Sequence, residues 1–223
     1  MNVQLEIACF DLESVIIADD AGADRIEICD HLSEGGTTPS WEMVFEAKER
    51  IKTDLFVMIR PRGGDFCYNE DEFEQMKNDI VLFKRLGVQG YVFGILTKDN
   101  EVDIERNKDL IAFAHPFPCT FHRAFDRTND VYQSLETIIS LGFQTILTSG
   151  AAQNVTEGLS TLKSLVQKAG ARISIMPGGG LRSSNIALIK NETAAHYYHS
   201  SAIVDASLLA DQNEIQLLKK GLK

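Results

Sequence analysis

The chain has 223 residues, of which 44% are hydrophobic and 24% charged, a balance typical of a globular protein with a substantial apolar core. Its formal net charge of −10, with 22 scattered lysines and arginines, argues against nucleic-acid binding, which requires a basic surface. No apolar run approaches the roughly 20 residues that cross a membrane, and the N-terminus lacks a signal-peptide pattern. We therefore expect a cytoplasmic protein with no membrane partner.

A short pattern recurs along the chain: a helical stretch, a glycine, two or three residues, and then a strand. Gly22, Gly87, Gly142 and Gly170 each precede such a strand. Glycine just beyond a helix supplies the left-handed backbone that ends it. Strand-like runs begin near residues 3, 25, 55, 90, 118, 144, 172 and 196.

Helical patterns fill the intervals between these runs. Asn69 and Glu72 form a capping box before an apolar stripe, and Ser40 and Asn129 are predicted to be N-caps. Eight strands alternating with helices predict a single (β/α)8 TIM barrel over residues 1–223. A doubly wound sheet is the main alternative, but no G-x-G-x-x-G motif follows the first strand.

Side chains alternate along a strand, and in a barrel the outward set packs against the helices and is apolar. The apolar strand positions therefore leave a mainly polar, sulfur-containing set in the lumen: Glu6, Arg25, Glu27, Cys29, Met58, Arg60, Thr120, His122 and Met176. Because buried charges are costly unless paired, Arg60 is expected to contact Glu27 or Glu6. The set forms either a structural ion-pair layer or a site at the C-terminal mouth, where barrel enzymes place theirs.

Charged residues also follow two of the predicted strands. The loop in IRPRGGDF carries Arg62 and Asp65. Arginine suits carboxylate or phosphate ligands because its planar fork donates two parallel hydrogen bonds. TFHRAFD places Arg123 and Asp126 next to His122, which could act as acid, base or metal ligand with a carboxylate orienting it. Alternatively, these groups only hold their loops in place.

Turns rich in glycine and serine follow the last three strands. They are LTSG with Thr148 and Ser149, MPGGG with Gly179 and Gly180, and HSSA with His199 and Ser200. Backbone N–H groups exposed in such turns bind anions, and barrels often hold phosphate after their seventh and eighth strands. The alternative is that the glycines only turn the chain.

The four cysteines are widely spaced and form no C-x-x-C pair. They are Cys9, Cys29, Cys67 and Cys119. This spacing signals neither a zinc site nor a redox motif, so we expect free thiols.

Seven stretches together resemble the CutC copper homeostasis family, in the family's order and over residues 3 to about 204. They are GADRIEIC, LSEGGTTPS, FVMIRPRGGDF, TFHRAFD, LTSG, MPGGG and HSSA. IRPRGGDF and TFHRAFD are the most specific of them. The resemblance implies a (β/α)8 barrel, a cytosolic protein, a homodimer or higher oligomer, and a role in copper handling, with Cu(I) bound in some members.

The chain departs from the family pattern in its first strand. Members place a cysteine where this chain has Ala8, and Cys9 is displaced by one residue, so the pleat turns it away from the lumen. The cysteine of the second strand is present as Cys29. The soft ligands of a Cu(I) site would then be Cys29 with Met58, Met176 or His122.

The residues and the resemblance lead to two functional hypotheses. A third is a barrel that binds a ligand but catalyses no reaction. The first is copper homeostasis through Cu(I) held by Cys29, which the resemblance implies. The second is an enzyme that acts on a small anionic or phosphorylated metabolite by acid–base chemistry at the C-terminal mouth. Its catalytic residues would be Glu27, Arg60, His122 and Asp126. Its ligand-binding residues would be Arg62, Asp65, Arg123, Thr148, Ser149, Gly179, Gly180, His199 and Ser200.

Overall fold

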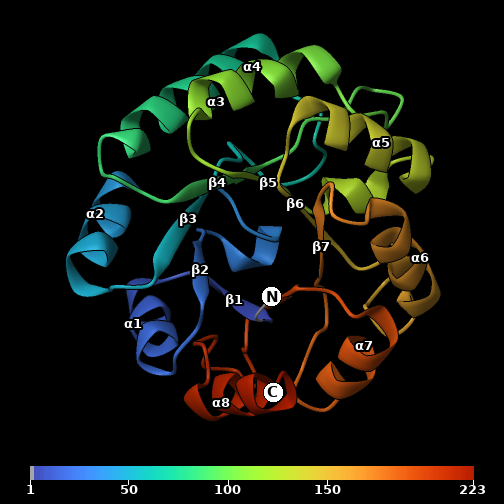
Figure 1. The fold of residues 1–223 in the computed structure, drawn as a ribbon. Helices are drawn as coiled ribbons and strands as arrows, with labels where there is room; N and C mark the ends of the chain where they lie inside the picture. Colours follow the sequence, from blue (N-terminus) through green and yellow to red (C-terminus); the bar gives the residue numbers. More distant parts are fainter. Residues whose placement is uncertain (1–2) are drawn as a thin grey trace.

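Between residues 3 and 223, which the computed structural model describes, eight parallel strands form a nearly closed barrel that eight α-helices surround (Figure 1). The strands are β1 (Gln4–Cys9), β2 (Arg25–Ile28), β3 (Asp54–Met58), β4 (Gly90–Phe93), β5 (Cys119–Phe121), β6 (Thr145–Thr148), β7 (Ser174–Pro177) and β8 (Tyr197–Ser200). Their order is β7-β6-β5-β4-β3-β2-β1-β8, and β7 contacts β8 where the sheet curls round. The structure therefore confirms the predicted (β/α)8 barrel.

The helices connect successive strands on the outside of the barrel. They are α1 (Leu12–Asp20), α2 (Trp41–Arg50), α3 (Glu70–Lys84), α4 (Ile104–Ala114), α5 (Val131–Leu141), α6 (Leu159–Ala169), α7 (Ile186–Thr193) and α8 (Gln212–Gly221), with short 3-10 helices η1 (Leu32–Glu34) and η2 (Arg123–Arg127). Each predicted strand start lies within two residues of the observed one. Within residues 3–223, no helix has both the length and the apolar character that a membrane crossing needs.

Local capping explains where several helices begin. Ser40 and Asn69 are N-caps as predicted, and Asn69 forms the full capping box with Glu72. The prediction for Asn129 is wrong by one residue. Asp130 caps α5, its carboxylate accepting hydrogen bonds from two backbone N–H groups, whereas the Asn129 side chain donates to the carbonyl of Asp99 in the loop between β4 and α4. Both residue types are good caps, so sequence preference alone does not choose between neighbours.

Buried apolar side chains separate into two layers, as strand alternation requires. The larger layer lies between the strands and the helices and contains outward residues such as Leu5, Ile7, Ile26 and Val57. A small cluster fills part of the lumen: Cys29, Phe56, Met58 and Val92. Cys9 packs in the outer layer, which confirms that it faces away from the lumen.

Candidate functional site at the C-terminal mouth

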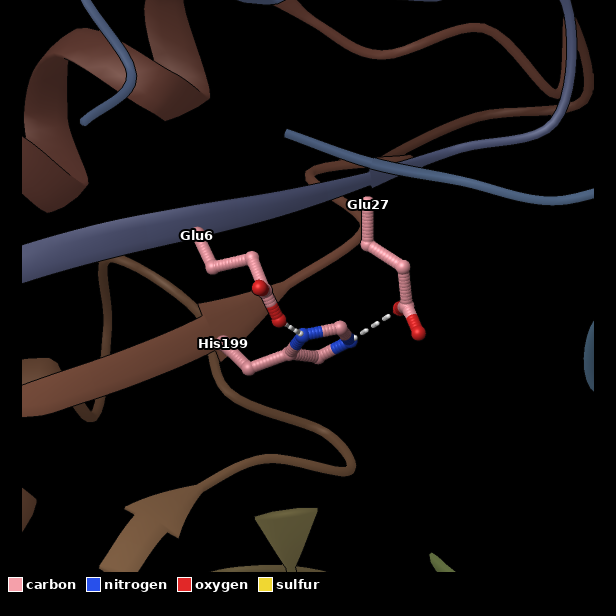
Figure 2. Close-up of side chains that lie close together, drawn as sticks. All are labelled: Glu6, Glu27 and His199. Atoms are coloured by element: carbon pink, nitrogen blue, oxygen red, sulfur yellow. Dashed lines mark hydrogen bonds and ion pairs between the residues drawn. The ribbon is translucent and has the colours of Figure 1, made fainter. Parts of the chain in front are cut away.

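A buried chain of charged side chains lies in the lumen where β1, β2 and β8 meet (Figure 2). The register of the strands places Glu6 of β1 beside Arg25 of β2 and His199 of β8. Glu6 accepts a hydrogen bond from Arg25 Nε at 2.5 Å, and its other oxygen lies 2.7 Å from His199 Nδ1. On the far side of the imidazole, His199 Nε2 lies 3.7 Å from Glu27 Oε2. We call these four side chains the lumen network.

The lumen network separates the pKa values of its two carboxyl groups. Burial acts to raise the pKa of Glu6, but the charges and hydrogen bonds of Arg25 and His199 outweigh it and lower the pKa to about 2. Burial prevails at Glu27 and, offset in part by His199, raises its pKa to about 7. Burial acts to lower the pKa of His199, but the two carboxylates raise it above its ordinary value. Glu27 can therefore accept and release a proton near neutral pH.

A cavity of about 90 Å³ lies beside this network. Phe10 and Phe66 line it with aromatic rings, and its polar and sulfur-containing lining comes from Glu27, Cys29, Met58, Arg60, His122, Arg123 and His199. Three buried atoms of these residues have no hydrogen-bond partner in the described chain: Glu27 Oε1, Arg60 Nε and His122 Nε2. Because buried polar atoms are normally paired with protein groups or water, these three atoms leave hydrogen-bonding capacity unused around the cavity. A larger hollow of about 650 Å³ opens between α5, α6 and β7, but no predicted site residue lines it.

Arg60 makes no ion pair with Glu6 or Glu27, so the predicted pairing is wrong. Its guanidinium donates to the carbonyl oxygens of Glu34 and Gly36, each at 2.7 Å, and of Gly64 at 3.2 Å. Arg60 follows the end of β3 and so reaches the loops above the lumen. Arg25, which the register places beside the glutamate of β1, makes the ion pair instead.

His122 is a neutral side chain buried in the lumen. Burial, reinforced by the positive charge of Arg60, lowers its pKa to about 3. Its Nδ1 accepts a hydrogen bond from the backbone N–H of Ala124 at 3.3 Å, which leaves the ring proton on Nε2. A nearby carboxylate could have oriented this ring, but Asp126 bonds to the loop after β6, and the backbone N–H of Ala124 contacts the histidine instead.

Asp126 organises the loop that follows β6. Its carboxylate accepts hydrogen bonds from Thr148 Oγ1 at 2.5 Å and from the backbone N–H groups of Ser149 and Ala151, each at 3.1 Å. It also pairs with Arg123 Nε at 2.8 Å. Asp126 does not line the cavity, so its contacts position Arg123 and this loop.

The predicted ligand residues Gly179 and Gly180 in the turn after β7, and Ser200 at the end of β8, lie outside the cavity lining. Gly179 and Gly180 adopt left-handed φ values of 99° and 75°. A Cβ on Gly179 would lie 3.0 Å from the guanidinium carbon of Arg123, so the glycine lets that side chain approach the loop. Ser200 Oγ donates to the carbonyl of Leu181 at 2.8 Å and ties the two turns together.

Arg62 and Asp65 lie on the loop after β3 and outside the cavity lining. Arg62 Nη1 lies 3.0 Å from Asp65 Oδ1, and Arg62 Nε lies 2.6 Å from a carboxylate oxygen of Glu72 at the start of α3. These contacts favour the alternative in which both residues hold their own loop.

Cys29 and Met58 are the soft donors beside the cavity. A Cβ on Gly36 would lie 3.3 Å from Cys29 Sγ and 3.5 Å from the Met58 methyl carbon, so both side chains pack under the same turn, and they belong to the same apolar cluster in the lumen. Burial, followed by the negative charge of Glu27, raises the pKa of the Cys29 thiol. A metal that binds this sulfur must therefore displace a proton.

The remaining candidate ligands suit Cu(I) less well. Cys9 is outside the lumen, and the sulfur of Met176 accepts a hydrogen bond from Arg25 at 3.4 Å. Over residues 3–223, one group of at least three His, Cys, Asp or Glu residues brings its ligand atoms within 4.8 Å of one another: Glu6, Glu27 and His199. Carboxylate and imidazole ligands do not select Cu(I) as thiolate and thioether do. Cys29 with Met58 is the donor pair whose chemistry fits that ion.

Sequence reasoning placed Glu6 and Arg25 in the lumen but gave neither a role in the site. Their inward strand positions were the signal that could have joined them. Phe10 and Phe66 were missed, because both lie in loops, where no periodicity indicates the direction of a side chain.

Comparison with known proteins identifies the family. The CutC family model matches residues 3–204. The chain belongs to the CutC family. A relative from Homo sapiens named copper homeostasis protein cutC homolog is 46% identical over 198 residues, which are 89% of this chain and 72% of the relative. A CutC family protein from Chromobacterium violaceum is 43% identical over 202 residues, which are 91% of this chain and 82% of that protein.

Solved structures agree with this family and with the fold. The crystal structure of CutC from Streptococcus agalactiae has a TM-score of 0.84 and 36% sequence identity, and the match covers 89% of this chain and 98% of that one. Phosphoribosylanthranilate isomerase from Thermotoga maritima has a TM-score of 0.65 at 13% identity, over 99% of this chain and 98% of that one. The second likeness shows the barrel fold alone, since one barrel fold supports many unrelated functions.

Proposed function

We propose that this protein acts in copper homeostasis and binds Cu(I) through Cys29 with Met58. The family supports this role, because its curated mammalian members are named for copper homeostasis. The observation that carries the site is that a buried thiol and a buried thioether pack under one turn and line the same cavity, since these are the donors that Cu(I) prefers. A homodimer, which the family resemblance implies, stays a prediction.

Substitution of Cys29 by serine is expected to weaken Cu(I) binding roughly 100-fold, because a hydroxyl replaces the one soft anionic donor of the pair. Anaerobic titration against a competing Cu(I) chelator measures the affinity. Cys9→Ser is the matched control, because Cys9 is equally buried but lies outside the lumen. Equal affinities for wild type and Cys29→Ser, or a loss confined to Cys9→Ser, would contradict the proposal.

A second function is favoured by a different observation, the three unpartnered polar atoms around one cavity. We propose that the mouth of the barrel also binds and transforms a small anionic or phosphorylated metabolite. Glu27 would move protons, and Arg60 and His122 would donate hydrogen bonds to the ligand. Arg123 would hold a negative group at the rim, since it donates to protein through Nε and Nη2 and keeps Nη1 for an anion.

Inorganic phosphate is the probe for the proposed anion site at Arg123, at the mouth of the barrel. Isothermal titration of the wild type is expected to show binding, and Arg123→Ala should weaken it by roughly tenfold or more, because a charge-assisted donor is lost. Arg62→Ala is the control, because the Arg62 guanidinium is engaged by two carboxylates on its own loop. Absence of phosphate binding, or an equal loss in the two variants, would count against an anion site at the rim.

A further inference from the structure

We propose that the lumen network is a second metal site, in which His199 Nε2 and the carboxylate of Glu27 bind a divalent transition-metal ion such as Zn²⁺. This inference goes beyond both proposed functions, because it concerns a different ion and a different set of donor atoms. The juxtaposition that carries it is a buried imidazole nitrogen that lies 3.7 Å from a buried carboxylate oxygen, too far for a hydrogen bond.

The two sides of the His199 ring differ, as Figure 2 shows. Nδ1 lies 2.7 Å from Glu6 Oε1, the length of a charge-assisted hydrogen bond, whereas Nε2 lies 3.7 Å from Glu27 Oε2. If the ring only bridged two carboxylates as a charged pair, both contacts would be expected at about 2.7–2.9 Å. The Nε2 side of the ring therefore faces a carboxylate to which it is not bonded.

The separation on this side suits an ion that both groups share. Zn²⁺ lies roughly 2.0–2.2 Å from histidine nitrogen and carboxylate oxygen ligands, and at those distances it spans the 3.7 Å gap with an angle of about 115–135°, a little wider than tetrahedral. Nitrogen and oxygen donors also suit a divalent ion better than Cu(I). His199 and Glu27 could therefore hold one ion with little movement of either side chain.

Glu27 has unused capacity as a ligand. Its side chain is buried, and Oε1 has no hydrogen-bond partner within residues 3–223. Buried carboxylates are normally paired with a cation or coordinate a metal ion. An ion bound by Oε2 would balance the charge of this carboxylate, and an ion bound by both oxygens would also satisfy Oε1. With the ion bound, Glu27 is a ligand rather than the proton carrier of the second proposed function.

Glu6 positions the imidazole for this role. A carboxylate that accepts a hydrogen bond from Nδ1–H fixes the tautomer in which Nε2 carries the free lone pair, an arrangement typical of metal-binding histidines. Glu6 is itself fixed, because its other oxygen accepts a hydrogen bond from Arg25 Nε at 2.5 Å. Glu6 is therefore a positioning residue that acts through His199.

The remaining coordination positions face the lumen cavity. Glu27 and His199 both line this cavity of about 90 Å³, and 11% of the His199 side chain is exposed, which gives an ion access to the ring. Two protein ligands leave positions open for water or a small ligand, unlike a closed structural zinc site. Arg25 balances Glu6, and Glu27 balances one of the two charges of the ion, so the open positions favour an anion.

The test titrates the metal-free chain with Zn²⁺ against a chromophoric chelator. The wild type should bind one equivalent. His199→Ala and Glu27→Gln should each weaken binding roughly 100-fold or more, because each removes one of two protein ligands. His196→Ala is the matched control and should bind Zn²⁺ like the wild type, because this exposed histidine lies just before β8, at the opposite end of the strand from His199.

Two measurements on the wild type identify the ligands, and they decide the matter if the variants do not fold. Co²⁺ in place of Zn²⁺ should give visible bands without the intense near-ultraviolet charge-transfer band of a cysteine ligand. In nitrogen NMR, Zn²⁺ should shift the Nε2 resonance of His199, while Nδ1 keeps its proton toward Glu6.

The inference is overturned if the wild type does not bind Zn²⁺, or if His199→Ala binds it as tightly as the wild type. A cysteine charge-transfer band with Co²⁺, or coordination through Nδ1, also overturns it. None of these measurements involves Cu(I) or phosphate, so failure here is distinguishable from failure of either proposed function.

Discussion

Replacing Glu6 with alanine should lower the free energy of unfolding at pH 7 by about 3–5 kcal/mol, because removal of one partner leaves buried charges without compensation. Glu6 is fully buried and contacts both Arg25 and His199, which are themselves buried. Without its carboxylate, the guanidinium of Arg25 keeps its charge in a site that excludes water. Chemical denaturation at pH 7 measures the effect.

The control for this substitution is an ion pair on the protein surface, in contrast to the buried pair that Glu6 forms. Glu136 contacts Arg172 on the surface, and both side chains are about half exposed, at 57% and 47%. Such pairs contribute little to stability, so Glu136→Gln should leave the unfolding transition nearly unchanged. Equal effects of Glu6→Ala and Glu136→Gln would show that the lumen network does not stabilise the fold.

Replacing Glu27 with glutamine should increase the free energy of unfolding relative to wild type, by an amount that grows with pH. In the wild type the pKa of Glu27 is raised from 4.5 to about 7, chiefly by burial. Between these values the folded state holds a proton that the unfolded state has released, so wild-type stability falls as pH rises through this window. Glutamine removes this penalty. The stability of Glu27→Gln relative to wild type should therefore rise by about 3 kcal/mol from pH 4.5 to pH 8.

Glu6→Gln provides a control with the opposite sign and a different pH window. The folded-state pKa of Glu6 is lowered to about 2, so its stabilising contribution is present above pH 4.5 and is lost as pH falls toward 2. Denaturation series from pH 3 to pH 8 on the three proteins separate the two carboxylates. A Glu27→Gln difference that stays constant with pH would show that this carboxyl is not destabilised by burial.

The opposite outcomes expected for Glu6 and Glu27 bear on function. Glu6 strengthens the fold, whereas an ionised Glu27 weakens it above neutral pH. A buried acid that costs stability is typical of a functional site, where perturbed pKa values serve proton transfer.

The order and position of strands and helices could be predicted because their signals are local. Glycine just beyond four of the helices, the capping box at Asn69 and the two-residue alternation all act within a few residues of the chain. The alternation also predicted that Glu27 and Cys29 face the lumen and that Cys9 does not. The one-residue error at Asn129 arose because two neighbouring residues are both good caps.

The partners of the lumen residues were decided by tertiary structure. The alternation places both Arg25 and Arg60 on the lumen side, and nothing in either segment tells which of them meets the glutamate of β1. The parallel register of β1 with β2 selects Arg25, and the loops after β2 and β3 surround Arg60 with carbonyl oxygens instead. His122 likewise takes its hydrogen bond from the backbone of Ala124 rather than from Asp126.

The sequence by itself therefore determined the barrel, the CutC resemblance and the set of side chains that enter the lumen, because periodicity and capping are properties of contiguous segments. Only the tertiary structure decided that Glu6, Arg25, His199 and Glu27 form one network, and that one buried polar atom in each of Glu27, Arg60 and His122 has no hydrogen-bond partner within residues 3–223. Contacts between residues as far apart as Glu6 and His199 depend on closure of the barrel, which brings β8 beside β1.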